Sequence, residues 1–148
     1  MLKKRFVLLV VIVILASSII LAQQPAAGPF TAQQAAAGQA SYQANCAGCH
    51  QQNLGGSGDA PPLRGTQFVT NWGPRTTREL LSFMQLTMPP DKPGTMSAEE
   101  YAGIIAFVLR SNGVAAGNQA LTANTEVRIN SLPMPFRWCE SRTAKSDR

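Results

Sequence analysis

Two cysteines and a histidine lie within five residues of one another in the first third of the chain. The stretch C-A-G-C-H places Cys46 and Cys49 three positions apart, with His50 directly after the second cysteine. His50 is the single histidine among 148 residues, and one further cysteine, Cys139, lies near the far end. Thiols and an imidazole can bind a soft metal ion, form a disulfide or hold a prosthetic group.

Three kinds of chemistry compete for this cluster. A redox-active C-x-x-C pair normally opens a helix after a strand, and no strand-like alternation precedes Cys46. Zinc requires four ligands, but the adjacent Cys49 and His50 are poorly placed to reach one ion together, even with Cys139 as the fourth. C-x-x-C-H is the attachment pattern of c-type haem, in which the thiols bond two vinyl groups and the histidine binds the iron. Haem attachment is therefore favoured, and zinc or a chance C-x-x-C-H in a disulfide-stapled fold are the alternatives.

The N-terminal residues indicate the compartment in which this motif works. Residues 1–5 are mostly basic or apolar, and residues 6–22 contain no charge and no helix breaker. A polar, proline-containing stretch follows Ala22, which is the order of a secretory signal peptide cleaved at that alanine. The apolar run is nearly as long as the ~20 residues that span a bilayer, so a retained anchor is the alternative. Both predict an exported protein, periplasmic or anchored to the outer face of the inner membrane.

The remaining residues are enough for one small domain. We divide them into a linker at 23–30, a helical region at 31–113 and an irregular tail at 114–148. Three of the thirteen basic residues lie in the leader, so ten Lys and Arg oppose eight Asp and Glu in the remainder, which gives no support for nucleic-acid binding. Cys139 is expected to be an unpaired tail residue, with a reactive or intermolecular thiol as the alternative.

Three segments have the patterning of helices, and none that of strands. The first follows a potential N-cap at Thr31 and is rich in alanine and glutamine. Within it Gly38, Tyr42 and Cys46 are four apart and share one face. Gly38 weakens a helix, and a close crossing by a second helix would explain its presence; the alternative is simply a weaker helix.

The other two helices begin with capping boxes. Thr76 and Glu79 open the middle helix, while Ser97 and Glu100 open the last one, which an Asn–Gly pair ends after residue 111. Residues 58–74 are expected to be a loop. Its apolar side chains could line a pocket: Leu63, Phe68 and Trp72.

Together these patterns resemble a monohaem class I cytochrome c over about residues 31–113. The likeness rests on G-x-x-x-Y-x-x-x-C-x-x-C-H, then P-P-L-R-G, a tryptophan and T-M-P-P-D-K-P-G-T-M-S-A-E-E-Y. Within that family, the chain is most similar to cytochromes and cytochrome domains associated with quinoprotein dehydrogenases and with terminal oxidases. The resemblance implies an all-α fold of three main helices and loops wrapped around one covalent haem, with helices crossing near Gly38 and Tyr42 and an irregular C-terminal tail.

The resemblance also implies neighbours for the haem. A proline carbonyl accepts a hydrogen bond from the proximal histidine in this family, and we expect Pro62, rather than Pro61, to supply it to His50. Arg64 could pair with a haem propionate, although a solvated surface arginine explains it equally well. Two apolar side chains are also expected beside the haem: Leu63 and Trp72.

The sixth iron ligand is expected to be a methionine, because no second histidine exists. Met88 follows the middle helix and precedes two prolines that hold the chain extended, where the family has its methionine–proline motif. Met84 lies on the apolar side of the middle helix, and Met96 has hydrophobic-staple spacing with Tyr101. Met88 is therefore the expected ligand, and Met96, Met134 and an open iron are the alternatives.

An iron with histidine and methionine ligands has no free position, so it exchanges electrons and binds no substrate. We therefore expect an electron carrier and no catalytic residue. The resemblance implies a donor that is a dehydrogenase or quinol-oxidising complex, and a terminal oxidase or other acceptor. The alternatives are an open-haem enzyme or sensor, and a fixed cytochrome subunit of a dehydrogenase complex. Membrane contact is expected only if the N-terminal segment is retained.

Overall fold

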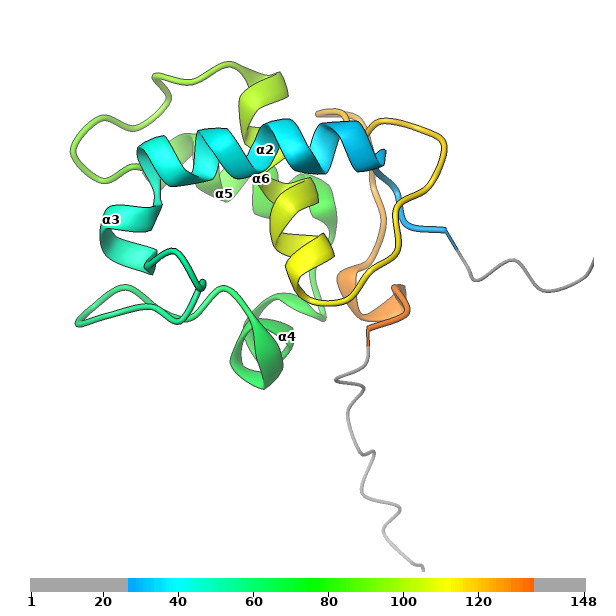
Figure 1. Ribbon diagram of the computed structural model, residues 1–148, viewed down its shortest axis with the longest axis horizontal. Coiled ribbons are helices and arrows are strands. Elements are labelled where there is room, and N and C mark those ends of the chain that lie inside the picture. Colours follow the sequence, from blue (N-terminus) through cyan, green and yellow to red (C-terminus); the bar gives the residue numbers. More distant parts are fainter. Residues whose placement is uncertain (1–26, 135–148) are drawn as a thin grey trace, which may run out of the picture.

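The computed structural model describes residues 27–134 and is all-α, as predicted (Figure 1). Within that range no strand is formed, and no helix is long and apolar enough to cross a membrane. The helices run in this order: α2 (Ala32–Asn45), α3 (Ala47–His50), α4 (Gly65–Trp72), α5 (Thr77–Thr87), α6 (Ala98–Ser111) and the 3-10 helix η2 (Ile129–Ser131).

The three expected helices begin where their caps predict. Thr31 accepts a hydrogen bond from the backbone of Gln34 at the start of α2. Capping boxes open α5 and α6, with both reciprocal bonds present in each. In α5 the backbone N–H of Thr76 donates to the Glu79 carboxylate, which lowers the pKa of that carboxyl.

Residues 58–74 were expected to be a loop, and this expectation is wrong for Gly65–Trp72, which form α4. Arg64 makes no side-chain cap for this helix. Instead, the buried Asn112 at the end of α6 accepts a bond from the Gly65 N–H at 2.8 Å. The helix therefore starts at a tertiary contact across 47 residues, which no local capping signal announces.

The predicted close crossing exists between α2 and α6 (Figure 1). Gly38 is buried, and a Cβ atom built on it would lie 1.8 Å from the carbonyl oxygen of Gly103. Gly103 faces it in turn, with its own Cβ position 3.4 Å from the Gly38 Cα. The two backbones therefore touch directly, and Gly38 is present because no side chain fits.

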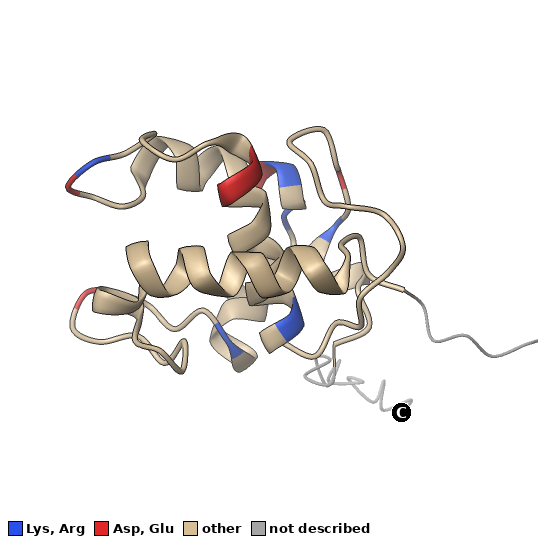
Figure 2. Cartoon of the chain, turned by 45° about the horizontal axis from the view of Figure 1, so that its top comes forward, with Lys and Arg blue, Asp and Glu red and all other residues tan. Residues whose placement is uncertain are grey.

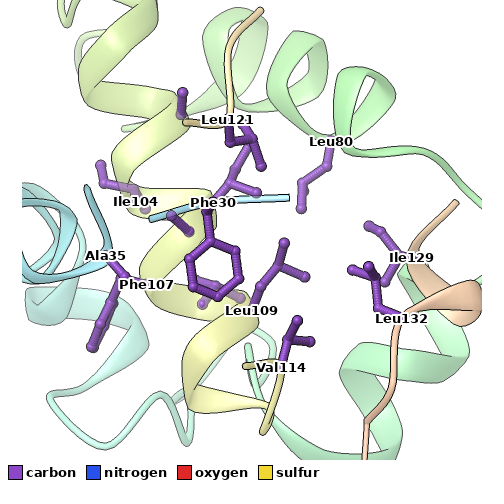
Figure 3. Packing of buried hydrophobic residues seen from close by; sticks show 14 of the residues in the cluster. Phe30, Ala35, Leu80, Ile104, Phe107, Leu109, Val114, Leu121, Ile129 and Leu132 are labelled. Atoms are coloured by element: carbon purple, nitrogen blue, oxygen red, sulfur yellow. The ribbon is translucent and has the colours of Figure 1, made fainter. Parts of the chain in front are cut away.

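The core is built around α6, whose residues from Tyr101 to Leu109 are all buried. Figure 3 shows apolar side chains from well-separated segments of the chain converging beside it: Phe30, Leu80, Leu109, Ile129 and Leu132. Phe30 is fully buried although it belongs to the expected linker 23–30. Residues 27–30 thus join the domain, and the Gly28 N–H bonds to the carbonyl of Ala115 at 2.8 Å.

The first part of the expected tail also belongs to the folded unit. Residues 114–134 are irregular except for η2, as predicted, but five of their apolar side chains are buried: Val114, Leu121, Ile129, Leu132 and Met134. The Gln34 amide group clips the segment to α2 by bonding both the carbonyl and the N–H of Leu121, at 2.7 and 2.8 Å. The core therefore extends past the boundary that was predicted between Gly113 and the tail.

Several predicted features lie outside the described residues. They are the leader at 1–22, the part of the tail from residue 135 onward, and Cys139 within it.

Candidate haem site

The C-x-x-C-H motif forms one tight turn at the end of α2 (Figure 1). The carbonyl of Cys46 accepts from the N–H groups of Cys49 and His50, at 3.2 and 2.9 Å. Both cysteines are free, the first half-buried and the second exposed. Burial raises the pKa of the Cys46 thiol to about 11, so the free side chain is uncharged. Between residues 27 and 134, no cluster of three His, Cys, Asp or Glu side chains could hold a metal ion.

The imidazole of His50 is buried and oriented by a backbone carbonyl. Its Nδ1 lies 2.9 Å from the carbonyl oxygen of Pro61. With Nδ1–H as the donor, Nε2 is left with its lone pair free for a metal. The expected kind of bond is therefore present.

The expected acceptor, Pro62, is wrong: the carbonyl bonded to the His50 ring is that of Pro61. The N–H of Leu63 donates to the carbonyl of Leu54 at 2.9 Å. This bond anchors residue 63 to the loop that follows the motif, and the Pro61 carbonyl two residues earlier is the one that meets the His50 ring.

Three successive backbone carbonyls at the end of the motif are each held by a hydrogen bond. That of Cys49 accepts from the Ser57 hydroxyl at 2.9 Å, and that of His50 from the Gly56 N–H at 3.0 Å. That of Gln51 accepts from the fully buried Tyr42 hydroxyl at 2.6 Å. Burial, followed by the nearby Cys46, raises the pKa of Tyr42 to about 12. The motif's backbone is thus fixed while its thiols and the imidazole Nε2 stay available.

Met88 lies where the sequence predicted, in extended backbone directly after α5. Its φ and ψ are −125° and 144°, and its side chain is half-buried. The other methionines of the described chain have packing roles: Met84 and Met96 pack against the core, and Met134 is buried within it. Met88 alone of these four is not part of that cluster. Its expected role as sixth ligand stays a prediction, and so does the haem contact of every residue named from the sequence.

The other expected neighbours differ in their surroundings. Leu63 packs against the core, and Trp72 meets Phe83 edge-on with ring centroids 5.1 Å apart. Arg64 is exposed, with its guanidinium 3.4 Å from the carbonyl of Asn53. On α5, Phe83 is partly exposed and Leu86 is 77 % exposed.

Asn112 holds three backbone groups of the domain together, a role that was not predicted from the sequence. Its fully buried amide donates to the carbonyls of Leu63 and Val108, at 3.0 and 2.8 Å, and accepts from Gly65. It thereby ties the end of α6 to the segment that follows the proline bonded to His50. An asparagine before glycine indicates only a helix end, so nothing local distinguishes this role.

A helix that ends in C-x-x-C-H and crosses a C-terminal helix through paired glycines, with its histidine held by a proline carbonyl, defines a class I cytochrome c. That is the class of this domain. More specifically, residues 33–108 match the family described as cytochrome c oxidase, cbb3-type, subunit III, and the chain belongs to this family. Searches of curated proteins and of solved structures found no match.

Membership implies a covalently bound haem c and haem-based electron transfer. The residues present fit that group. Two unpaired thiols flank one turn, and an oriented imidazole keeps one nitrogen free. Met88 is also half-buried and does not pack in the core cluster.

Proposed function

We propose that the protein is an exported electron carrier with one haem c, attached through Cys46 and Cys49 and ligated by His50 and Met88. The ligand assignment rests on which methionines belong to the core. Met84, Met96 and Met134 belong to the packing of the core, and Met88 does not. Bound haem c supplies a one-electron couple.

The residues of the chain have separate tasks in this proposal. The thiols hold the group permanently, and the Pro61 carbonyl fixes the His50 ring and increases the basicity of Nε2. The thioether of Met88 fills the remaining position, raises the reduction potential relative to two histidines and excludes oxygen. A filled site of this kind suits electron transfer and leaves no position for a substrate.

The proposed partners follow from the family and from the leader. The family description names a cytochrome c oxidase, which supports a terminal oxidase as acceptor. A dehydrogenase or quinol-oxidising complex is the proposed class of donor. The basic and apolar residues 1–22 support export, with the domain in the periplasm.

A fixed cytochrome subunit is the second candidate, because the same description names a subunit. The two candidates differ in the fate of the N-terminal segment. Intact mass of the purified protein distinguishes them: a chain that begins near Gln23 supports a free carrier. A chain that still begins at Met1 and occurs only in membranes supports the subunit.

Spectra of the holoprotein test the ligand assignment. The ferric protein should show the weak far-red charge-transfer band of a sulfur–iron bond, and the ferrous protein should resist carbon monoxide. Met88→Ala should remove the band, lower the reduction potential and allow carbon monoxide to bind, because the sixth position is then open.

Met96→Ala is the matched control, since it removes a methionine eight positions away that packs against the core. It should keep the band and cost about 1 kcal/mol or more of stability. Loss of the band in Met96→Ala but not in Met88→Ala would show that the assignment is wrong. Ready binding of carbon monoxide to the unmutated ferrous protein would instead favour an open-haem enzyme or sensor.

A further inference from the structure

The loop that carries Met88 has little of its own to hold it in place. Residues 90–95 are all exposed, and Pro89 is the one residue buried between Met88 and Met96. Two hydrogen bonds within the loop, from the Lys92 N–H to the Pro89 carbonyl and from the Thr95 hydroxyl to the Lys92 carbonyl, are local. Exposed loops with few buried contacts open at low free energy.

One buried hydroxyl links this loop to the body of the domain. Tyr101 lies in the first turns of α6 with no exposed surface. Its hydroxyl donates to the carbonyl of Met88 at 2.6 Å and accepts from the N–H of Gly94 at 3.2 Å. Within the described chain, these two bonds are the hydrogen bonds between residues 88–95 and α6.

The two bonds join the beginning of the loop to its end. Gly94 has a φ of 71°, the left-handed conformation that glycine adopts without strain, and this turns its N–H into the bond. The Tyr101 hydroxyl therefore uses both its donor and an acceptor lone pair. The aromatic ring belongs to the core, so packing and loop fixation are carried by different parts of one side chain.

We propose that the Tyr101 hydroxyl is a positioning group that keeps Met88 in place as an iron ligand, which rests on the ligation proposed above. It acts through the Met88 backbone and touches no metal itself. Removing the hydroxyl frees both ends of the loop while the ring still fills the core. The thioether is then released more often, although it remains the preferred ligand.

Tyr101→Phe in the holoprotein tests this, with Thr77→Val as matched control. Thr77 is also fully buried, and its hydroxyl also makes one donated and one accepted backbone bond, to Thr125 at 2.7 Å and from Val127 at 3.2 Å. It lies at the opposite end of α5 from Met88. The two variants therefore lose comparable hydrogen bonds at different places.

The readout is the rate at which carbon monoxide binds the ferrous protein, because binding waits for release of Met88. Two lost hydrogen bonds predict a rate about tenfold higher in Tyr101→Phe, with the far-red band retained in the ferric state. Thr77→Val should lower the unfolding midpoint to a similar extent and leave the rate unchanged. If carbon monoxide binds the two variants at equal rates, the positioning role of Tyr101 is wrong, whereas the proposed ligation by Met88 is not affected.

A second measurement needs no variant. The Gly94 amide should exchange slowly with deuterated solvent although its residue is exposed, because its N–H is held by a buried hydroxyl. Exchange as fast as that of a free amide would overturn the inference even if Met88 is the ligand. An unmutated protein that lacks the far-red band and binds carbon monoxide readily would overturn the ligation and this inference together.

Discussion

The hydrogen bond between His50 and Pro61 shows which feature of the haem site the residue types predict and which they do not. Residue type alone could locate the histidine, because C-x-x-C-H is local and no other histidine exists. Residue type could not select between two adjacent prolines, since both can accept a bond. The choice depends on how the whole loop folds, including the bond between the Leu63 N–H and the Leu54 carbonyl.

At the scale of a single residue, we predict the effect of replacing Asn112 on stability. Asn112→Leu keeps a similar volume but leaves the Gly65 N–H and the Leu63 carbonyl without their partner. We expect a loss of about 2–4 kcal/mol in the free energy of unfolding, measured by denaturant titration of the holoprotein. Asn118→Leu, at an exposed position, should change it by less than about 0.5 kcal/mol. Similar losses in both variants would contradict the structural role of Asn112.

At the scale of elements, the sequence was informative wherever a helix carried its own start signal. Capping boxes located α5 and α6, and Gly38 correctly indicated a crossing. The helix α4 was not predicted, because the group that bonds its first N–H is the side chain of Asn112, far along the chain. The spacing of Phe68, Val69 and Trp72 is helical, and this apolar pattern was the one local signal that could have revealed it.

The crossing of α2 and α6 gives the prediction for this scale. Gly38→Ala improves intrinsic helix propensity, but its methyl group would overlap the Gly103 carbonyl, so the helices must move apart. We expect a net loss of about 2–3 kcal/mol in unfolding experiments. Gly48→Ala adds the same methyl group in α3, where, apart from the adjoining residues and the backbone of α3 itself, no atom of residues 27–134 lies within 4 Å. A stable Gly38→Ala variant would mean that the crossing is looser than described.

At the scale of the whole molecule, charge is sparse and balanced. Residues 27–134 contain six basic and six acidic side chains, and residues 31–58, with all of α2 and the motif, contain none (Figure 2). The arrangement of the ends was the least predictable part. Phe30 and residues 114–134 join the core through long-range contacts, which leave no periodic pattern in an irregular segment.

The uncharged stretch predicts how a partner associates on the motif's side of the molecule. The charges that flank this stretch in space, those of Arg64 and Asp59, have opposite signs, so long-range steering is weak. The association rate with a solubilised terminal oxidase should therefore change by less than about threefold between low and physiological ionic strength. Gln52→Lys, at an exposed position beside the motif, should introduce salt dependence. Strong salt dependence in the unmutated protein would locate the contact on another face.

The glycine pair also sets an order in time. Gly38 and Gly103 are 65 positions apart, so the crossing cannot form until nearly the whole domain has been synthesised. The C-x-x-C-H turn follows Gly38 by only a few residues, and it therefore emerges long before the helix that closes over α2. With only Ala35, Gly38 and Tyr42 buried in the finished fold, α2 has little apolar surface with which to close earlier. The thiols of a growing chain are thus open to modification before the domain exists.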